Sequence, residues 1–90
     1  MKTFHNEEIY IKTDNFSDSI FKENTMFFDI ETTGFSPVKA IVYMIGCARR
    51  IKNRIVIDQY FAETPDDEAA VIEAFAGSLS GCSTIISFNA

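Results

Sequence analysis

The chain has 90 residues, enough for one small domain and too few for two independent cores. Hydrophobic residues make up 47% and charged residues 23%, a balance typical of a folded, soluble chain and not of a disordered tail. The formal net charge is −5, from 13 acidic and 8 basic residues. This charge argues against a free-standing, non-specific nucleic-acid binder, which normally presents a basic surface, and leaves open an enzyme whose acidic groups hold metal ions.

Neither membrane insertion nor secretion is indicated. The longest apolar stretch, residues 40–48, is much shorter than the roughly 20 residues that a membrane span needs. The N-terminus contains no apolar segment of the kind found in signal peptides. Cys47 and Cys82 match neither a disulfide framework nor a zinc site. We therefore expect a cytoplasmic protein whose two cysteines are reduced and buried.

Residues 1–25 are polar and interrupted, and they predict an irregular lead-in, extended or partly helical, that lies against the domain. Regular apolar patterns begin after this segment and predict three consecutive strands. The second strand is apolar almost continuously, as in a strand buried on both faces. The turn at residues 52–53 makes the second and third strands an antiparallel hairpin. The predicted strands cover residues 26–31, 41–51 and 54–63.

A helix is predicted next, with Thr64 as its N-cap, Pro65 at its first position and Gly81 at its left-handed C-terminal end. Residues 83–88 predict a fourth strand, which should pair in parallel with a central strand by a right-handed crossover. The fold class is thus α/β with a mixed sheet in the order β-β-β-α-β, and one sheet face stays uncovered by this chain. The predicted apolar stripe of the helix consists of Val71, Ile72, Phe75 and Leu79.

Two acids interrupt the first apolar strand. Because side chains alternate along a strand, Asp29 and Glu31 should point to one face, with their Cα atoms about 6.6 Å apart, while Phe28 and Ile30 point to the other. Such acids are costly unless something positive meets them, and they can serve a pair of Mg²⁺ ions roughly 4 Å apart. The alternative is a strand end whose acids lie in solvent or meet Lys and Arg. The preceding phenylalanines and the following Thr-Thr-Gly turn favour the metal site.

Residues 29–35 (DIETTGF) resemble the first motif of the DnaQ-like, or DEDD, 3′–5′ exonucleases of the ribonuclease-H-like fold. The resemblance continues through residues 45–46, 59–63 and 85–89, and this wider pattern is closest to the bacterial YprB-like branch. It implies a ribonuclease-H-like domain over residues 26–90. It also implies two-metal hydrolysis, with Mg²⁺ or Mn²⁺, at the 3′ ends of DNA or RNA.

The resemblance also implies roles for individual residues. Asp29 would bridge the two metal ions, and Glu31 would bind the ion that activates water. The remaining implied contacts are with the terminal nucleotide. The two threonines would offer backbone N–H groups, the glycine would form a tight turn, and the phenylalanine would wedge against the base. The asparagine would open the second motif of the family. These substrate-binding residues are Thr32, Thr33, Gly34, Phe35 and Asn89.

The second-motif and third-motif aspartates of that family are absent from these 90 residues. We therefore expect the chain to be the N-terminal portion of a longer nuclease domain, with hydrolysis assigned to the longer parent protein. The alternative is a catalytically inactive nuclease-fold fragment that serves as a binding or assembly module. A phosphatase of the haloacid-dehalogenase type is a third hypothesis, opposed by Glu31 and by the predicted hairpin. The uncovered sheet face predicts that the chain self-associates or is unstable.

Half of the basic residues gather in residues 49–54, around the predicted hairpin turn. A solvated hairpin tip explains them better than a nucleic-acid contact, because this turn should lie at the opposite end of the sheet from the acids. His5 is assigned no role.

Overall fold

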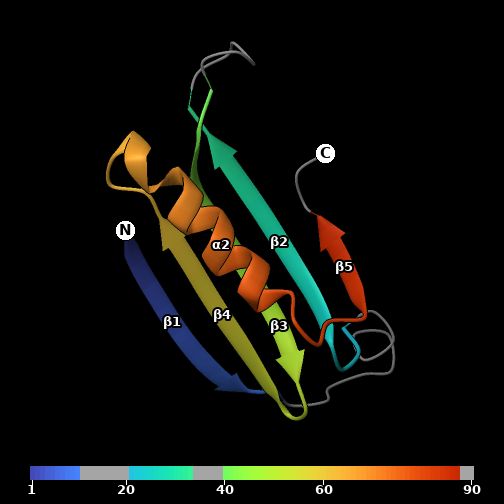
Figure 1. Cartoon of the computed structure of the whole chain (residues 1–90). Helices are drawn as coiled ribbons and strands as arrows, with labels where there is room; N and C mark the ends of the chain where they lie inside the picture. Colours follow the sequence, from blue (N-terminus) through green and yellow to red (C-terminus); the bar gives the residue numbers. More distant parts are fainter. Residues whose placement is uncertain (11–20, 34–39, 88–90) are drawn as a thin grey trace.

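In the part of the chain that the structure describes, five strands form one mixed sheet, and one α-helix lies on one side of it (Figure 1). The computed structural model describes residues 1–10, 21–33 and 40–87. The spatial order of the strands is β1-β4-β3-β2-β5. The strands are β1 (Lys2–Ile9), β2 (Thr25–Thr32), β3 (Val42–Ile51), β4 (Arg54–Phe61) and β5 (Thr84–Ser87). A 3₁₀ turn, η1 (Pro65–Asp67), leads into helix α2 (Glu68–Ser78).

The pairing predicted for the central strands is confirmed. β3 and β4 are antiparallel, and Lys52 takes a φ of 55° in the two-residue turn between them, the left-handed conformation that such turns use. β5 returns from α2 and runs parallel to β2. The observed sheet and helix confirm the predicted α/β class with a mixed sheet.

Residues 2–9 of the predicted lead-in are extended and lie against the domain as predicted, but they are regular and not irregular, because they form the edge strand β1, antiparallel to β4. The sequence of β1, KTFHNEEI, has no regular alternation of apolar and polar residues by which the strand could be recognised. All eight of its side chains are exposed. Its pairing rests on the backbone groups of β4, which would otherwise lack partners along that edge. Residues 11–20 of the predicted lead-in lie outside the described residues.

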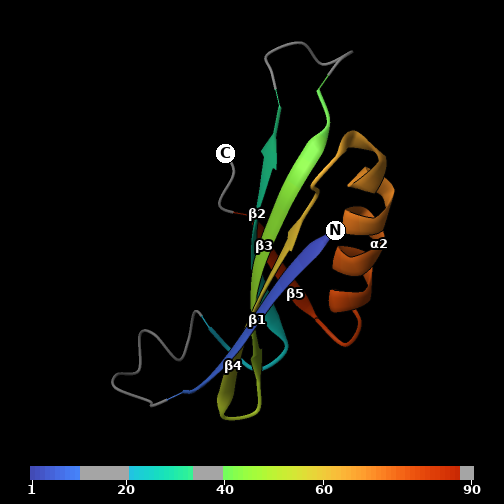
Figure 2. The ribbon, with the colours of Figure 1, turned by 90° about the vertical axis from the view of Figure 1, so that its left-hand side faces the viewer.

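Helix α2 covers one face of the sheet and builds the core there (Figure 2). Val71 of the helix is fully buried, together with Met26 of β2 and Ile45 of β3. Two further predicted helix positions, Phe75 and Leu79, also pack on this core, with the Phe75 ring 5.2 Å from that of Phe28.

Ile72 is a correction to the predicted stripe, because its side chain points away from the sheet and is exposed. The inward positions instead follow the 3.6-residue period of the helix through Ala74 and Ser78. Ala74 and Ser78 thus face the sheet, although the predicted stripe left both of them out.

The start of α2 differs from the predicted cap. Thr64 makes no capping hydrogen bond with its side chain, and one 3₁₀ turn precedes the α-helix. Asp67 Oδ2 instead accepts the Glu63 N–H at 3.0 Å, and Glu68 Oε2 accepts the Val42 N–H at 2.6 Å, which ties the helix to the start of β3. Gly81 takes the predicted left-handed conformation, with φ of 82°.

Among the described residues, no helix or strand covers the face opposite α2 (Figure 2), although the Phe21 ring packs on Phe27 there, with the ring centres 5.0 Å apart. β3 is therefore buried on one face and half-buried on the other, and its predicted burial on both faces is not observed. Apolar side chains of this open face, Phe4, Ile57 and Phe61, reach solvent. No helix in the described part of the chain has the length and apolar character needed to cross a membrane.

Candidate active site

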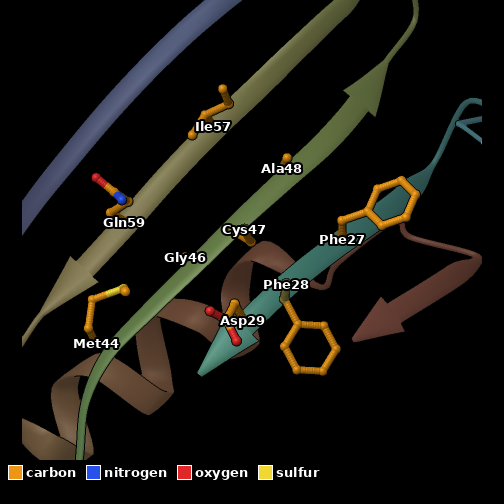
Figure 3. Close-up of a pocket in the computed structure, with 9 residues that line it drawn as sticks. All are labelled: Phe27, Phe28, Asp29, Met44, Gly46, Cys47, Ala48, Ile57 and Gln59. Atoms are coloured by element: carbon orange, nitrogen blue, oxygen red, sulfur yellow. The ribbon is translucent and has the colours of Figure 1, made fainter. Parts of the chain in front are cut away.

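The two acids lie on the central strand β2, on the open face of the sheet. Asp29 is opposite Gly46 of β3, and Glu31 is opposite Met44. The alternate residues of β2, Phe28 among them, pack beneath α2 on the other face. The strand alternation that the sequence predicts therefore places both carboxylates on one surface, and Figure 3 shows Asp29 beside the neighbouring strand β3.

The two carboxyl groups interact directly. A hydrogen bond to the Asp29 carboxyl raises the pKa of Glu31, and the negative charge of Asp29 raises it further. Among the described residues, neither acid forms an ion pair with Lys, Arg or His; Arg49 pairs with Asp58, and Lys2 pairs with Glu63. Glu31 and Asp29 thus form a concentration of negative charge whose compensation has to come from elsewhere.

A shallow depression of about 260 Å³ lies beside Asp29 on the open face (Figure 3). Gly46 lies in its floor, where an added Cβ would make ordinary contacts, 3.7 Å from Met44 Sδ and 3.8 Å from Gln59 Cγ. Phe27 and Ile57 complete its apolar wall. Asp29 therefore borders a largely apolar surface that carries few competing polar groups.

The segment after β2 is closed by two hydrogen bonds. The Thr33 N–H donates to the Ile41 carbonyl at 2.9 Å, and the Ile41 N–H donates to Thr33 Oγ1 at 3.2 Å. An incoming nucleotide would have to compete with Ile41 for the Thr33 N–H. Thr32 is exposed as the last residue of β2. The predicted contacts of Gly34, Phe35 and Asn89 lie outside the described residues.

Two carboxylates suit a hard divalent cation, which prefers oxygen ligands. They do not complete its coordination, because in the described ranges no three His, Cys, Asp or Glu residues come together as a metal-binding group. Asp29 and Glu31 could hold one side of a cation, and water, substrate or further carboxylates would have to provide the rest.

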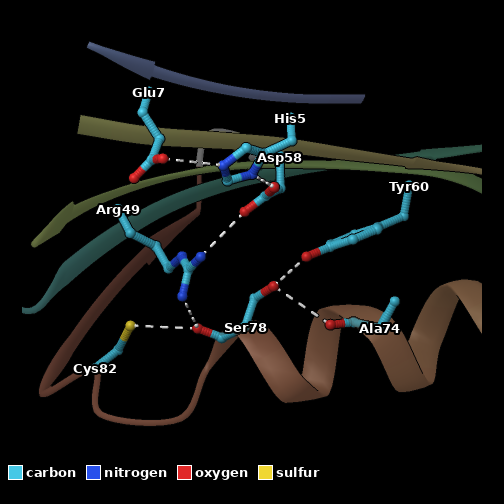
Figure 4. Close-up of polar contacts among 8 residues, drawn as sticks. All are labelled: His5, Glu7, Arg49, Asp58, Tyr60, Ala74, Ser78 and Cys82. Carbon is cyan, nitrogen blue, oxygen red and sulfur yellow. Dashed lines mark hydrogen bonds and ion pairs between the residues drawn. The ribbon is translucent and has the colours of Figure 1, made fainter. Parts of the chain in front are cut away.

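Two of the basic residues near the β3–β4 turn, Arg49 and Arg50, bind other parts of the chain and are not merely solvated. Arg49 reaches under the helix, where its Nη2 lies 3.1 Å from Asp58 Oδ2 and its Nη1 donates to the Ser78 carbonyl at 3.5 Å (Figure 4). Arg50 donates to the Phe21 carbonyl at 2.8 Å. Both arginines are used in holding the fold together, so the interpretation as a solvated tip is wrong for them.

His5 belongs to the same polar cluster and was missed by sequence reasoning. Its Nδ1 lies 2.5 Å from Asp58 Oδ1. One signal was present in the sequence: Asp58 falls between Val56 and Tyr60 at an inward-facing position of β4, where a carboxylate needs a cationic partner. The partner from β1 could not be identified without knowing that β1 pairs with β4.

Comparison with known proteins identifies the family to which the chain belongs. The model of the RNase H superfamily matches residues 26–90. A protein of Bacillus subtilis (strain 168), named "Uncharacterized protein YprB", is 28% identical over 69 residues, which cover 76% of this chain and 16% of that protein. No solved structure matches the chain. The mixed sheet with one helix agrees with part of a ribonuclease-H-like α/β fold, and the chain belongs to the RNase H superfamily.

Proposed function

We propose that the protein hydrolyses phosphodiester bonds of nucleic acids, with divalent metal ions held in part by Asp29 and Glu31. The observation that carries this proposal is the pair of adjacent carboxyl groups on the open face, with no cation from the described residues to neutralise them. Membership of the RNase H superfamily supports the same activity. The chain spans 16% of the length of the relative from B. subtilis, so the activity is proposed for the full-length gene product.

The finer proposal is a 3′–5′ exonuclease of the DnaQ-like type that uses two Mg²⁺ or Mn²⁺ ions. It is supported by the arrangement of Asp29 and Glu31 ahead of the Thr-Thr-Gly turn. When bound, such ions would supply a hydroxide nucleophile and stabilise the leaving oxygen. The contribution of this chain is to place two oxygen ligands on one surface of a rigid central strand. Because Glu31 must be ionised to bind a cation, cation affinity should rise as the pH passes its raised pKa.

The test is digestion of single-stranded DNA and RNA oligonucleotides, labelled at either end, by the full-length gene product with Mg²⁺ or Mn²⁺. Shortening from the 3′ end is expected. The metal contribution amounts to several kcal/mol, so Asp29→Asn and Glu31→Gln should each lower the rate by roughly 10²-fold or more. Glu8→Gln is the matched control, because Glu8 is an exposed acid on the edge strand β1. The activity of this variant should equal that of the wild type. Undiminished activity in both carboxylate variants would rule out the site.

A second candidate function is a nuclease-fold module that binds or assembles without catalysis. It is favoured by the absence, within the described ranges, of a third ligand near the two acids. Full-length protein that binds an oligonucleotide in Mn²⁺ and leaves it intact would support this candidate. The antiparallel pairing of β2 with β3 counts against the phosphatase hypothesis, which requires a parallel layout at that point.

A further inference from the structure

The edge strand β1 has few means of attachment. All its side chains are exposed, including Phe4 at 56% and Ile9 at 66%, so burial of apolar surface contributes little to holding it. The match to the RNase H superfamily begins at residue 26, so β1 is an addition to the matched region. What remains is the backbone pairing with β4 and a small number of polar contacts.

The central polar contact joins His5 to Asp58. The Asp58 side chain is 7% exposed, near the middle of β4, and it already has Arg49 as a partner on its inner side. His5 lies across from Asp58 in the strand register and meets its outer oxygen. The other ring nitrogen, Nε2, lies 3.5 Å from Glu7 Oε2 (Figure 4). Only the protonated imidazolium can donate from both nitrogens, so two carboxylates facing one ring favour the charged form.

We propose that β1 is a detachable edge strand whose attachment to β4 is strengthened by protonation of His5, which then bridges Asp58 and Glu7. The device is independent of the proposed hydrolytic activity, because it acts at the far edge of the sheet from β2.

The direction of the pH effect follows from the contacts. The hydrogen bond that the His5 ring donates to the Asp58 carboxylate is the main cause that raises the pKa of His5 above 6.5, and the contact with Glu7 adds to it. A histidine whose pKa is higher when β1 is attached strengthens attachment at low pH, and this contribution is lost as the pH rises through the raised pKa. We therefore expect β1 to be held most firmly below about pH 6.5 and to loosen above the raised pKa.

The neighbouring groups leave His5 as the switch at mildly acidic to neutral pH. Besides Asp58 and Glu7, the groups on this side of the sheet are Arg49 and Cys47 from β3, Tyr60 from β4 and Ser78 from α2. Burial raises the pKa values of the Cys47 thiol and the Tyr60 hydroxyl, so neither titrates in that range. The Met1 amine, which pairs with Glu63 and Asp67, has its pKa raised above 8.0 by these acids and titrates later.

The experiment is NMR on the chain of residues 1–90. The pKa of His5 is read from its imidazole resonances. Amide-exchange protection, relative to an unstructured peptide at the same pH, is measured in β1 and β3 between pH 5.5 and 8. Protection in β1 should fall by about tenfold for every unit by which the measured pKa of His5 exceeds 6.5. Protection in β3 should stay constant.

His5→Gln is the matched variant, because its amide can still donate one hydrogen bond to Asp58 but cannot titrate. Its β1 protection should not change over the same pH range, and an N-terminally acetylated chain should keep the wild-type pH response. A His5 pKa at or below 6.5 would overturn the proposal without any variant. Equal loss of β1 protection in wild type and His5→Gln would overturn it as well.

Discussion

The two faces of the sheet differ in how their charges and apolar groups are matched. Beneath α2, Asp58 lies between two basic side chains, Arg49 and His5, and the apolar groups around it are buried. On the open face, Asp29 and Glu31 have only each other among the described residues, and apolar side chains reach solvent beside them. On the covered face, Asp58 thus helps to hold the fold together. On the open face, Asp29 and Glu31 are available to bind a group from outside the described residues.

This contrast separates stability from function. The covered face supplies the burial and the paired charges that hold the sheet together. The open face leaves carboxylates uncompensated, which costs stability and is typical of groups that serve a binding or catalytic role. Substitutions of the same kind on the two faces should therefore give different results.

The largest difference is expected for isoleucine to alanine. Ile45 is 2% exposed beneath α2, and Ile57 is 37% exposed on the open face of the neighbouring strand. Ile45→Ala should lower the free energy of unfolding by about 4 kcal/mol, because it leaves a cavity in the core. Ile57→Ala should lower it by less than about 1 kcal/mol, because the Ile57 side chain borders solvent and its removal leaves no enclosed cavity. Urea denaturation of the two variants measures the difference, and equal losses would contradict the distinction between the faces.

Aspartate to asparagine should separate the faces in the same way. Asp58→Asn leaves the Arg49 guanidinium without its anion in a largely buried position, so we expect a loss of about 3 kcal/mol. Asp29→Asn removes a repulsion with Glu31, so the unfolding free energy should stay unchanged or rise. Denaturation at pH 7 without divalent ions tests both, and a destabilised Asp29→Asn would show that Asp29 has a structural role.

Divalent cations should act on the open face alone. At a Mn²⁺ concentration of ten times its Kd, one bound ion stabilises the fold by about 1.4 kcal/mol. Wild type should gain this stability, and Glu31→Gln should gain much less. The rise in Tm with Mn²⁺, measured with Mg²⁺ and Ca²⁺ alongside, tests the site without any assay of hydrolysis. An equal gain in Glu31→Gln would place cation binding elsewhere.

The smallest effect is expected from the titration of Glu31. Its pKa is raised in the folded chain, chiefly by the hydrogen bond to Asp29, so its ionisation opposes folding. Wild type should therefore lose stability relative to Glu31→Gln as the pH rises through that pKa, and the two should converge at low pH where Glu31 is protonated. Thermal unfolding at pH 4 and pH 7 gives the comparison. A difference that grows toward low pH would have the wrong sign.

Much of this architecture could be predicted from the sequence because local patterns were strong. The apolar runs around Ile45 and the turn at Lys52 specified the hairpin, and Gly81 specified the end of the helix. The common face of Asp29 and Glu31 followed from strand alternation alone. Further ligands for a cation could not be predicted, since they depend on segments that meet only in three dimensions.

Two of the failures, at β1 and at Arg49, have a common physical cause, which is that contacts between strands decided them. β1 shows no apolar alternation, and its pairing partner lies 53 residues away at the His5–Asp58 contact. Arg49 was placed in solvent because its partner lies on the next strand. Ile72 is a separate failure. Its hydrophobicity favours the core, but the 3.6-residue period of the helix turns Ala74 toward the sheet and Ile72 toward solvent.

The order in which the strands occur along the chain has a consequence for how the protein folds. β3 and β4 are joined by two residues, so their hairpin closes a very short loop and should be the first part of the sheet to form. β1 precedes the other four described strands along the chain, yet it cannot pair until β4 has been synthesised. The first of these strands to be synthesised therefore waits for the fourth before it joins the sheet, and it stays open to other contacts until then.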